Sequence, residues 1–478
     1  MVEPGLHDLV DRIAGRLVGA VTPDPNLRIV DAGHDARHVQ PGWLYCCVPG
    51  SRADGHDFAP AAAAAGAIAL LVERRLELDV PQILVESTRA AMGPAAALIH
   101  GDPSNDLTVI GVTGTNGKSS MVQLLSDIHS RAGQRTEIIG TISGVRTTPE
   151  ATDLQRLLAT ARDTGKSVVA MEVSSHALSM GRVKGTQFAS TVFTNLGRDH
   201  LDFHHTVEDY FLSKALLFTE GYSRHHVINI DDSYGRRLLD LAQGDVETYS
   251  MADVDELRYV GPTSHFRWRG RHVALPLAGD HNVSNAVGAA TCAMANGVSI
   301  DDVVAALEQT VPVRGRFEMV AGSQPFHVAI DYAHTPDAME AALTAARRVA
   351  GPNRVLVVFG CGGDRDSLKR PEMGRVAQRG ADVVIVTSDN PRSEEPGAIV
   401  DAILAGIDTK NDVTIELDRR AAIGLAIAGA DPGDIVLIAG KGHETQQIIG
   451  DQILDFDDAK VACEFLGAAK RGTSEAPA

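Results

Sequence analysis

The chain has 478 residues, which is more than one hydrophobic core usually holds and predicts about three domains. Apolar residues make up 44% of it and aromatic residues only 4%, a composition typical of α/β proteins with closely packed helices and sheets. The formal net charge of -18 argues against non-specific nucleic-acid binding, because a phosphate backbone would be repelled over most of the surface.

The cysteines and the hydropathy pattern indicate where the chain works. Five cysteines are scattered without paired metal-ligand spacing, which predicts reduced thiols and no zinc site. The N-terminus has early acidic residues and no apolar core of signal-peptide length, and no later stretch reaches membrane-spanning length without interruption. We therefore expect a soluble cytoplasmic monomer that contacts neither membrane nor nucleic acid.

Residues 1–106 are expected to form a small N-terminal α/β domain. Short strands are predicted at LYCCVPG from Leu44 and at IALLVE from Ile68, and the alanine-rich run between them predicts a buried helix. The segment ends at GDPSND, residues 101–106, whose composition predicts a linker.

The stretch GVTGTNGKSS, residues 111–120, is the most informative motif of the chain. It lies between a β-branched apolar run and a segment with apolar residues at helical spacing, which is the order of a phosphate-binding loop. Gly114 and Gly117 permit a turn whose N–H groups face a polyphosphate. Lys118 can neutralise the terminal oxygens, and Ser119 can bind Mg²⁺ at the helix N-terminus. An ordinary turn would also use glycine, but lysine and hydroxyl at these offsets favour ATP.

Residues 107–312 predict a central domain with a mostly parallel sheet, because SVVAMEV, STVFTN and HHVINI alternate with helical patterns. A first polar cluster, EVSSHAL, follows one of these strands, where an open sheet exposes its loops to ligands. Glu172 is suited to a second Mg²⁺. His176 is suited to the metal or to orienting a neighbour, although a lone histidine beside an apolar run is more often structural.

A second polar cluster lies between the next predicted strand and the helix that follows it. It consists of Asn195, Arg198, Asp199 and His200. Helix capping would be the plain explanation for these residues. Lys214 lies in the following helix among apolar neighbours, so we expect a partly buried amine with a lowered pKa. A neutral amine reacts with CO₂ to give a carbamate, a carboxylate-like Mg²⁺ ligand. The residues alone favour a lysine whose stem reaches water.

Residues 313–478 restart the alternation and predict a doubly wound, Rossmann-like C-terminal domain. Four apolar strands are each followed by turn formers and charges, in DYAHTPDAME, GCGGDRDSLKRP, TSDNPRSEEP and GKGHE. Because parallel strands end at one edge of a sheet, a shared site is expected there. Arg365 and Arg392 are suited to carboxylate recognition. Asn390 and Glu444 are suited to an amino group or amide, whereas DNPR alone would indicate a simple turn.

Taken together and in this order, the motifs resemble those of the Mur ligase family. The resemblance runs from DARHVQPGWLYCCVPGSRADGH near residue 35 through GKGHE at residue 440, nearly the whole chain. It is closest to the members that add the third amino acid to UDP-N-acetylmuramoyl-L-alanyl-D-glutamate, or UDP-MurNAc-L-Ala-D-Glu. The family's domains bind a uridine nucleotide, ATP and an amino acid, in the order of the three predicted segments.

The resemblance implies ATP, two Mg²⁺ ions and a CO₂-derived carbamate on Lys214. It implies catalytic roles for Lys118, Glu172, His176 and Lys214, and metal binding by Ser119, Glu172, His176 and the Lys214 carbamate. Nucleotide contacts are implied at Thr113, Gly114, Thr115, Asn116, Gly117, Lys118, Ser119, Asn282, Asn285, Arg316 and Asp331. Contacts to UDP-MurNAc-L-Ala-D-Glu are implied at Ser51, Arg52, Ala53, Thr147, Thr148, Ser174 and Arg182.

In the family, DNPR marks members that use meso-diaminopimelate rather than L-lysine, and this chain reads DNPR at residues 389–392. Amino-acid contacts are implied at Arg365, Asp389, Asn390, Pro391, Arg392, Gly440 and Glu444. Arg392 would hold the distal carboxylate that lysine lacks. Lysine should be rejected, because it would leave that arginine unpaired.

The chain departs from the family pattern mainly at the nucleotide-sugar end. Ala36 replaces a serine, Met180 a glutamine and His281 a phenylalanine, and the loop between GTISG and TTPE is short. A ligase of the same architecture with another acceptor or amino acid therefore stays open, of the L-lysine-adding, specialised-metabolite or folylpolyglutamate type. A switch ATPase that drives a partner is more remote, since the DNPR and GKGHE loops have no role there.

Overall fold

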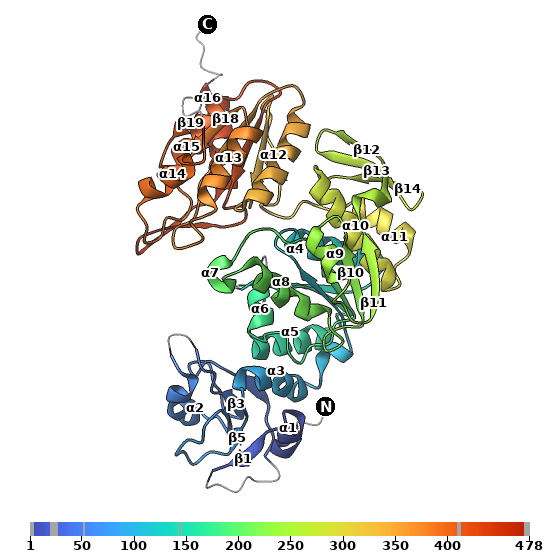
Figure 1. Cartoon of the computed structure of the whole chain (residues 1–478), viewed down its shortest axis with the longest axis vertical. Helices are drawn as coiled ribbons and strands as arrows, with labels where there is room; N and C mark the ends of the chain where they lie inside the picture. The colour runs from blue at the N-terminus through green and yellow to red at the C-terminus, as the bar shows by residue number, and fades with distance from the viewer. Residues whose placement is uncertain are drawn as a thin grey trace.

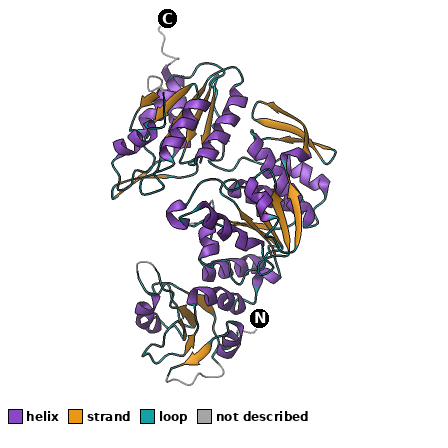
Figure 2. Ribbon diagram, viewed as in Figure 1, coloured by secondary structure: helices purple, strands orange, loops and turns teal. Residues whose placement is uncertain are grey.

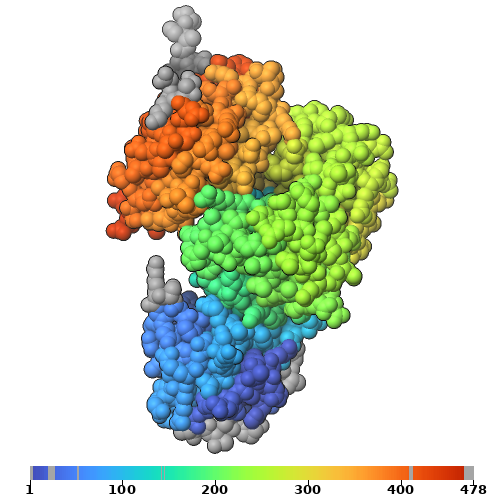
Figure 3. All heavy atoms as spheres, in the orientation of Figure 1, coloured from blue at the N-terminus to red at the C-terminus, as the bar shows by residue number. Residues whose placement is uncertain are grey.

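The computed structural model describes residues 4–19, 27–50, 53–141, 143–144, 146–408 and 413–472. Figure 1 shows a column of three α/β bodies that follow one another along the chain. The same bodies form three lobes in Figure 3, with an indentation between the green and orange lobes. Within the described ranges, no helix is long and apolar enough to cross a membrane.

The N-terminal body is built on a five-stranded sheet of order β1-β5-β4-β3-β2. Its strands are β1 Arg16–Val18, β2 Asp31–Gly33, β3 Trp43–Cys46, β4 Ala69–Val72 and β5 Gln82–Leu84, with β1 antiparallel. Its helices are α1 Leu6–Arg12, α2 Ala59–Ala64 and α3 Thr88–Ile99. The predicted strands and the helix between them are present. That helix, α2, buries only Ala59 and Ala62, because residues one turn apart form a single inward stripe.

The central body contains a six-stranded parallel sheet of order β11-β10-β9-β6-β8-β7. Its strands are β6 Thr108–Thr113, β7 Thr136–Ile139, β8 Val168–Glu172, β9 Ser190–Phe193, β10 His225–Asn229 and β11 Asp245–Tyr249. The helices are α4 Lys118–Arg131, α5 Ala151–Asp163, α6 Ser175–Ser179, α7 Leu201–His204, α8 Val207–Ala215, α9 Ser233–Leu238, α10 Asp280–Ala295 and α11 Ile300–Leu307. Both faces of β6 are buried, Ile110 in one core and Val109 in the other, as expected of a covered parallel sheet.

A separate three-stranded antiparallel sheet follows, which the sequence pattern did not predict. It consists of β12 Val254–Val260, β13 Thr263–Trp268 and β14 Arg271–Leu275. Figure 1 shows it beside α10, close to the first helix of the C-terminal body. This small sheet therefore gives the central body an additional surface toward its neighbour.

The C-terminal body has a six-stranded sheet of order β15-β16-β20-β17-β18-β19, in which only β15 is antiparallel. Its strands are β15 Glu318–Met319, β16 His327–Asp331, β17 Val355–Phe359, β18 Val383–Val386, β19 Val413–Ile415 and β20 Ile435–Ala439. A hairpin of β21 Gln446–Ile449 and β22 Gln452–Asp455 follows.

Helices cover both faces of this sheet (Figure 2). Helices α12 Pro336–Ala350, α13 Arg370–Gly380 and α14 Pro396–Leu404 pack in one core, and α15 Arg419–Ala428 and α16 Asp458–Gly472 in the other. The fold is therefore the predicted doubly wound one. The four strands that precede the polar loops are parallel neighbours, so their carboxyl ends meet at one edge.

Candidate active site

The phosphate loop joins β6 to α4 and depends on its glycines. Gly114 has φ 154° and Gly117 has φ 86°, which side chains with a Cβ rarely adopt. A Cβ on Gly117 would lie 2.7 Å from the Asn285 side-chain oxygen, and one on Gly114 would lie 1.9 Å from Thr194 Oγ1. The glycines thus let α10 and the end of β9 pack against the loop.

Two lysine amines converge on one carbonyl beneath this loop. Lys118 Nζ donates to the carbonyls of Gly114 and Thr115, each at 2.9 Å, and Lys214 Nζ donates to Gly114 at 2.8 Å. Lys214 is fully buried, 4.5 Å from the centre of the Tyr210 ring. Burial and then the charge of Lys118 hold the pKa of Lys214 well below its ordinary value, which favours a neutral amine. Burial also lowers the pKa of Lys118.

Hard oxygen ligands lie beside the loop. Glu172, at the end of β8, accepts hydrogen bonds from Ser119 Oγ at 3.0 Å and from the Thr141 N–H at 2.9 Å. No group of three or more His, Cys, Asp or Glu converges on a metal site among the described residues. Mg²⁺ commonly binds through one or two carboxylates together with substrate phosphates, so this donor set suits Mg²⁺ bound with a nucleotide.

Three histidine rings gather where α6 and α7 meet. The His176 ring centre lies 4.8 Å from that of His200 and 5.5 Å from that of His204. Burial lowers the pKa of His176, which favours a neutral ring with a free lone pair. The predicted His176 is therefore in a form that can coordinate a cation.

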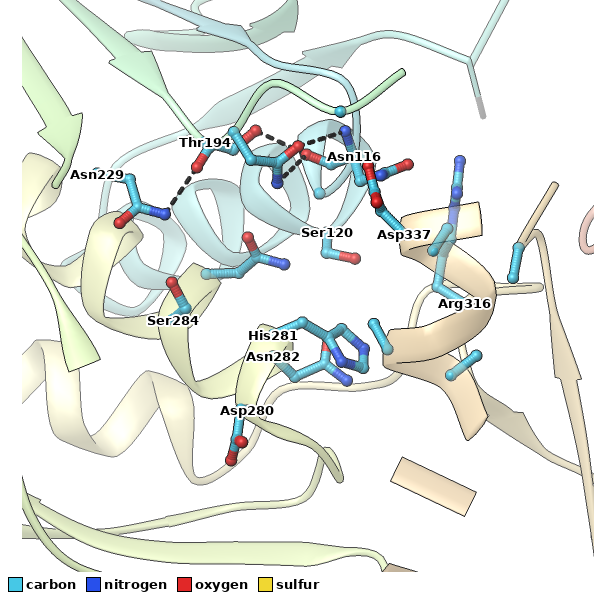
Figure 4. Close-up of a pocket in the computed structure, with 18 of the residues that line it drawn as sticks. Asn116, Ser120, Thr194, Asn229, Asp280, His281, Asn282, Ser284, Arg316 and Asp337 are labelled. Carbon is cyan, nitrogen blue, oxygen red and sulfur yellow. Dashed lines mark hydrogen bonds between the residues drawn. The ribbon is translucent and has the colours of Figure 1, made fainter. Parts of the chain in front are cut away.

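A cavity of about 400 Å³ opens next to the phosphate loop, between the central and C-terminal bodies (Figure 4). Its volume is within the usual range for small-molecule pockets. Seven predicted nucleotide contacts line it: Asn116, Gly117, Ser119, Asn282, Asn285, Arg316 and Asp331. The other four lie in the loop or at its two ends: Thr113, Gly114, Thr115 and Lys118. Arg316 crosses between the bodies, donating to Ser119 Oγ at 3.3 Å with its guanidinium 4.5 Å from the centre of the Tyr332 ring.

A second cavity, of about 680 Å³, also lies between these two bodies. From the central body it is lined by Thr147, Thr148, Ser174, His176 and Arg182, and from the C-terminal body by Arg365, Asp389, Asn390, Arg392, Gly440 and Glu444. Thr148 Oγ1 donates to the Glu172 carbonyl and accepts the Ser174 N–H, both at 3.0 Å. This pair of bonds fixes the loop that carries Thr147 and Thr148, called the substrate loop below, to the strand end that carries Glu172.

The remaining predicted contacts to the nucleotide precursor and the amino acid are not among the described residues that line the second cavity. Ser51 and Arg52 lie outside the described residues. Ala53 is exposed in the N-terminal body, where its carbonyl accepts the Gly50 N–H at 3.0 Å, and it lines neither cavity. The Pro391 carbonyl lies against Gly363, where an added Cβ would meet that oxygen at 1.9 Å.

The C-terminal wall of the second cavity is held by a residue that the sequence reasoning missed. Lys441, within GKGHE, is fully buried and donates to Asn390 Oδ1 at 3.0 Å and to Glu444 Oε2 at 3.2 Å. Asn390 in turn donates to Glu444 at 2.8 Å. Arg392 has φ 51° and donates to the Gly363 carbonyl at 2.7 Å. The sequence signal for Lys441 was its position between two glycines, directly after an apolar strand.

Polar contacts cross between the two bodies at each cavity. On one side, His334 Nε2 lies 3.7 Å from Asp199 Oδ2, a second pairing that the sequence reasoning missed. On the other side, Arg348 of α12 makes two contacts to Asp280, one of them at 2.6 Å, and donates to the Tyr259 hydroxyl at 2.7 Å. These contacts therefore join the central and C-terminal bodies at the lining of both cavities.

Three family models match the chain in order. They are the Mur ligase family catalytic domain at residues 28–103, the Mur ligase middle domain at 112–293 and the Mur ligase glutamate ligase domain at 315–442. The chain belongs to the Mur ligase family. The resemblance in its motifs is thereby confirmed, and membership makes it a ligase.

Individual relatives agree with this assignment. The Mur ligase described here is 44% identical over 464 residues to the UDP-N-acetylmuramoyl-L-alanyl-D-glutamate--2,6-diaminopimelate ligase of Geobacillus kaustophilus, covering 91% of this chain and 94% of the relative. It is 43% identical to the enzyme of that name from Streptomyces coelicolor, with 96% of each chain covered. A solved structure of that name superposes with a TM-score of 0.70 at 31% identity, covering 98% of this chain and 100% of the other.

Proposed function

We propose that this Mur ligase joins meso-diaminopimelate to UDP-MurNAc-L-Ala-D-Glu, with conversion of ATP to ADP and phosphate, in cytoplasmic synthesis of a peptidoglycan precursor. The observation that carries the proposal is the second cavity. One of its walls holds His176 and the substrate loop fixed to Glu172, and the other holds the DNPR and GKGHE loops. Relatives named for this activity match almost the entire chain.

Each body receives one substrate in this proposal. Residues 1–106 would bind the uridine nucleotide, residues 107–312 ATP, and residues 313–478 the amino acid. The phosphate loop in the second segment and the DNPR loop in the third support the division.

In the first step, one of the two free carboxylates of the D-glutamyl residue, the one that becomes the amide, attacks the γ-phosphorus of ATP, which gives an acyl phosphate and ADP. Phosphoryl transfer needs mainly positioning and electrostatic stabilisation, and this site supplies them without a nucleophilic side chain. The loop N–H groups, Lys118 and Arg316 would hold the phosphates. Mg²⁺ ions held by Ser119, Glu172, His176 and a carbamylated Lys214 would, when bound, offset their negative charge.

The surroundings of Lys214 support carbamylation. A neutral amine attacks CO₂, forms an N–C bond and releases a proton, which leaves a negative carbamate. The low pKa of Lys214 makes its lone pair available. A negative carbamate on Lys214 would also lie close to the positive charge of Lys118, because the two amines share the Gly114 carbonyl. A carbamate can thus bind a cation beside the phosphate loop.

In the second step, an amine of meso-diaminopimelate attacks the acyl carbon, phosphate leaves and an amide forms. Asn390 and Glu444, held by Lys441, would position the amino-acid end that reacts. Arg392 and Arg365 would bind carboxylates, with Arg392 reading the distal one. Closure of the two bodies around the substrates would exclude water, which otherwise hydrolyses the acyl phosphate.

The test supplies the purified enzyme with ATP, Mg²⁺ and UDP-MurNAc-L-Ala-D-Glu, and compares meso-diaminopimelate, L-lysine and other amino acids by the mass of the product. We expect phosphate release that depends on both acceptor and amino acid, with product only from meso-diaminopimelate. Product from another amino acid would show a different member of the family. ATP turnover without a new amide bond would show an ATPase.

A further inference from the structure

Three arginines surround one buried carboxylate at the junction of the N-terminal and central bodies. Glu150 precedes α5 and its side chain is 8% exposed. Arg146 donates to Glu150 at 2.6 Å, Arg182 Nε lies 3.0 Å from the same carboxylate oxygen, and Arg89 of α3 approaches the other oxygen at 3.4 Å. Three guanidinium groups around one carboxylate leave the cluster with an excess of positive charge.

The hydrogen-bond donors of Arg182 have few good acceptors. It donates to the Thr148 carbonyl at 3.2 Å and to Met180 Sδ at 3.4 Å, and a thioether is a weak acceptor. Its Nε is close to Glu150 but lacks an acceptor in hydrogen-bonding geometry. Burial, together with the charges of Arg146 and Arg89, lowers the pKa of Arg182 despite the opposing effect of Glu150. This balance leaves the cluster electrostatically suited to a further anion.

Two of the three arginines line the cavity proposed to bind the nucleotide precursor. Arg146 and Arg182 line the second cavity together with Thr147, Thr148 and Ser174. The Arg146 side chain is 54% exposed, so Glu150 holds one side of its guanidinium while the rest stays accessible. Arg89 belongs to the N-terminal body, which places the cluster between the proposed uridine domain and the reaction centre.

We propose that Arg146, with Arg89 and Glu150 as its support, is a specificity-determining residue that binds an anionic group of the nucleotide precursor. The inference rests on the proposed function and goes beyond the contact implied for Arg182. A guanidinium binds carboxylate or phosphate oxygens through paired hydrogen bonds. The precursor offers both, in the α-carboxylate of its D-glutamyl residue and in its diphosphate.

Arg146→Gln in the full chain tests the proposal, with Arg347→Gln as the matched control. Arg347 is a partly exposed arginine of the C-terminal body, with a side chain that is 41% exposed. It pairs with a single carboxylate, that of Asp382. We expect Arg146→Gln to raise the KM for UDP-MurNAc-L-Ala-D-Glu about tenfold, as for loss of a charged hydrogen bond, and the KM for ATP and meso-diaminopimelate less than twofold. Arg146→Lys should recover part of the loss, and equal melting temperatures would show intact folding.

Two altered precursors identify the anion. If Arg146 binds the α-carboxylate, Arg146→Gln should not discriminate between the natural precursor and its α-amide, whereas the wild type should. If it binds the diphosphate, the variant should show no loss toward N-acetylmuramoyl-L-alanyl-D-glutamate, which lacks UDP. Precursor kinetics equal to those of Arg347→Gln would overturn the inference, and so would an equal rise in KM for all three substrates. Failure of the wild type to form product would instead overturn the proposed function.

Discussion

A buried ion pair beneath the amino-acid loops allows a quantitative prediction. Arg419 and Asp458 have side chains with 0% exposure and form two hydrogen bonds, at 2.8 and 2.7 Å. Arg419 also donates to the Ala439 carbonyl at 2.9 Å, at the end of the strand that leads into GKGHE. In the variant Arg419→Met, a flexible apolar chain replaces the guanidinium and leaves the Asp458 carboxylate buried without its partner.

Loss of one partner from a buried ion pair costs about 3–5 kcal/mol. The equilibrium constant for unfolding of the C-terminal body should therefore rise by a factor of roughly 10² to 10⁴. Hydrogen exchange read by mass spectrometry on peptides from β18 and β20 measures this change, and peptides from β6 in the central body serve as an internal reference. The KM for meso-diaminopimelate should rise as well, because the strand end before GKGHE loses a hydrogen bond.

The neighbouring residue provides the control. Arg420 pairs with Glu464 between the same two helices, but both side chains are about half exposed, so Arg420→Met should cost at most about 1 kcal/mol. The double variant Arg419→Met with Asp458→Leu removes both charges and should recover most of the stability. Equal protection in Arg419→Met and Arg420→Met would refute the reasoning. A double variant as unstable as the single one would assign the loss to packing rather than to the unpaired carboxylate.

Three further substitutions test the site. Lys214→Ala should abolish turnover, and short carboxylic acids should restore part of it by replacing the carbamate; normal turnover in this variant would contradict the metal-binding role. Arg392→Ala should raise the KM for meso-diaminopimelate, by an amount that corresponds to a loss of about 2 kcal/mol of binding free energy. An unchanged KM for the amino acid would reject the assignment. Arg348→Gln should raise the KM for ATP and expand the molecule in small-angle scattering, because the contacts to Asp280 and Tyr259 are lost; an unchanged radius and KM would exclude a role in closure.

The sequence predicted those parts of the molecule that follow from local pattern. Apolar strands alternating with helices indicated the parallel sheets, and parallel strands necessarily end at one edge, so the polar loops after β16, β17, β18 and β20 could be expected to meet. The apolar neighbours of Lys214 indicated a partly buried amine with a lowered pKa, although the residues alone favoured a stem that reaches water. That preference was wrong, because the apolar packing around the helix buries the amine fully and burial lowers its pKa.

The parts that escaped prediction depend on contacts between distant segments or carry a weak pattern. Strand β12 is mostly exposed, with three charged residues among its seven, so its hydropathy does not stand out from that of a loop. The pairing of Asp199 with His334, and of Arg348 with Asp280, is set by how two bodies dock, which no local spacing encodes. The same is true of Arg89, which lies 61 residues from its partner Glu150.

The crossing of Arg316 from one body to Ser119 on the other bears on how such an enzyme could be inhibited. A compound lodged in that gap would keep the two halves of the nucleotide site apart without imitating adenine or phosphate. Its potency would depend on how readily the two bodies separate as well as on competition with the phosphates of ATP, which the same residues would hold. Raising the ATP concentration would weaken it only to the extent that nucleotide itself draws the lobes together.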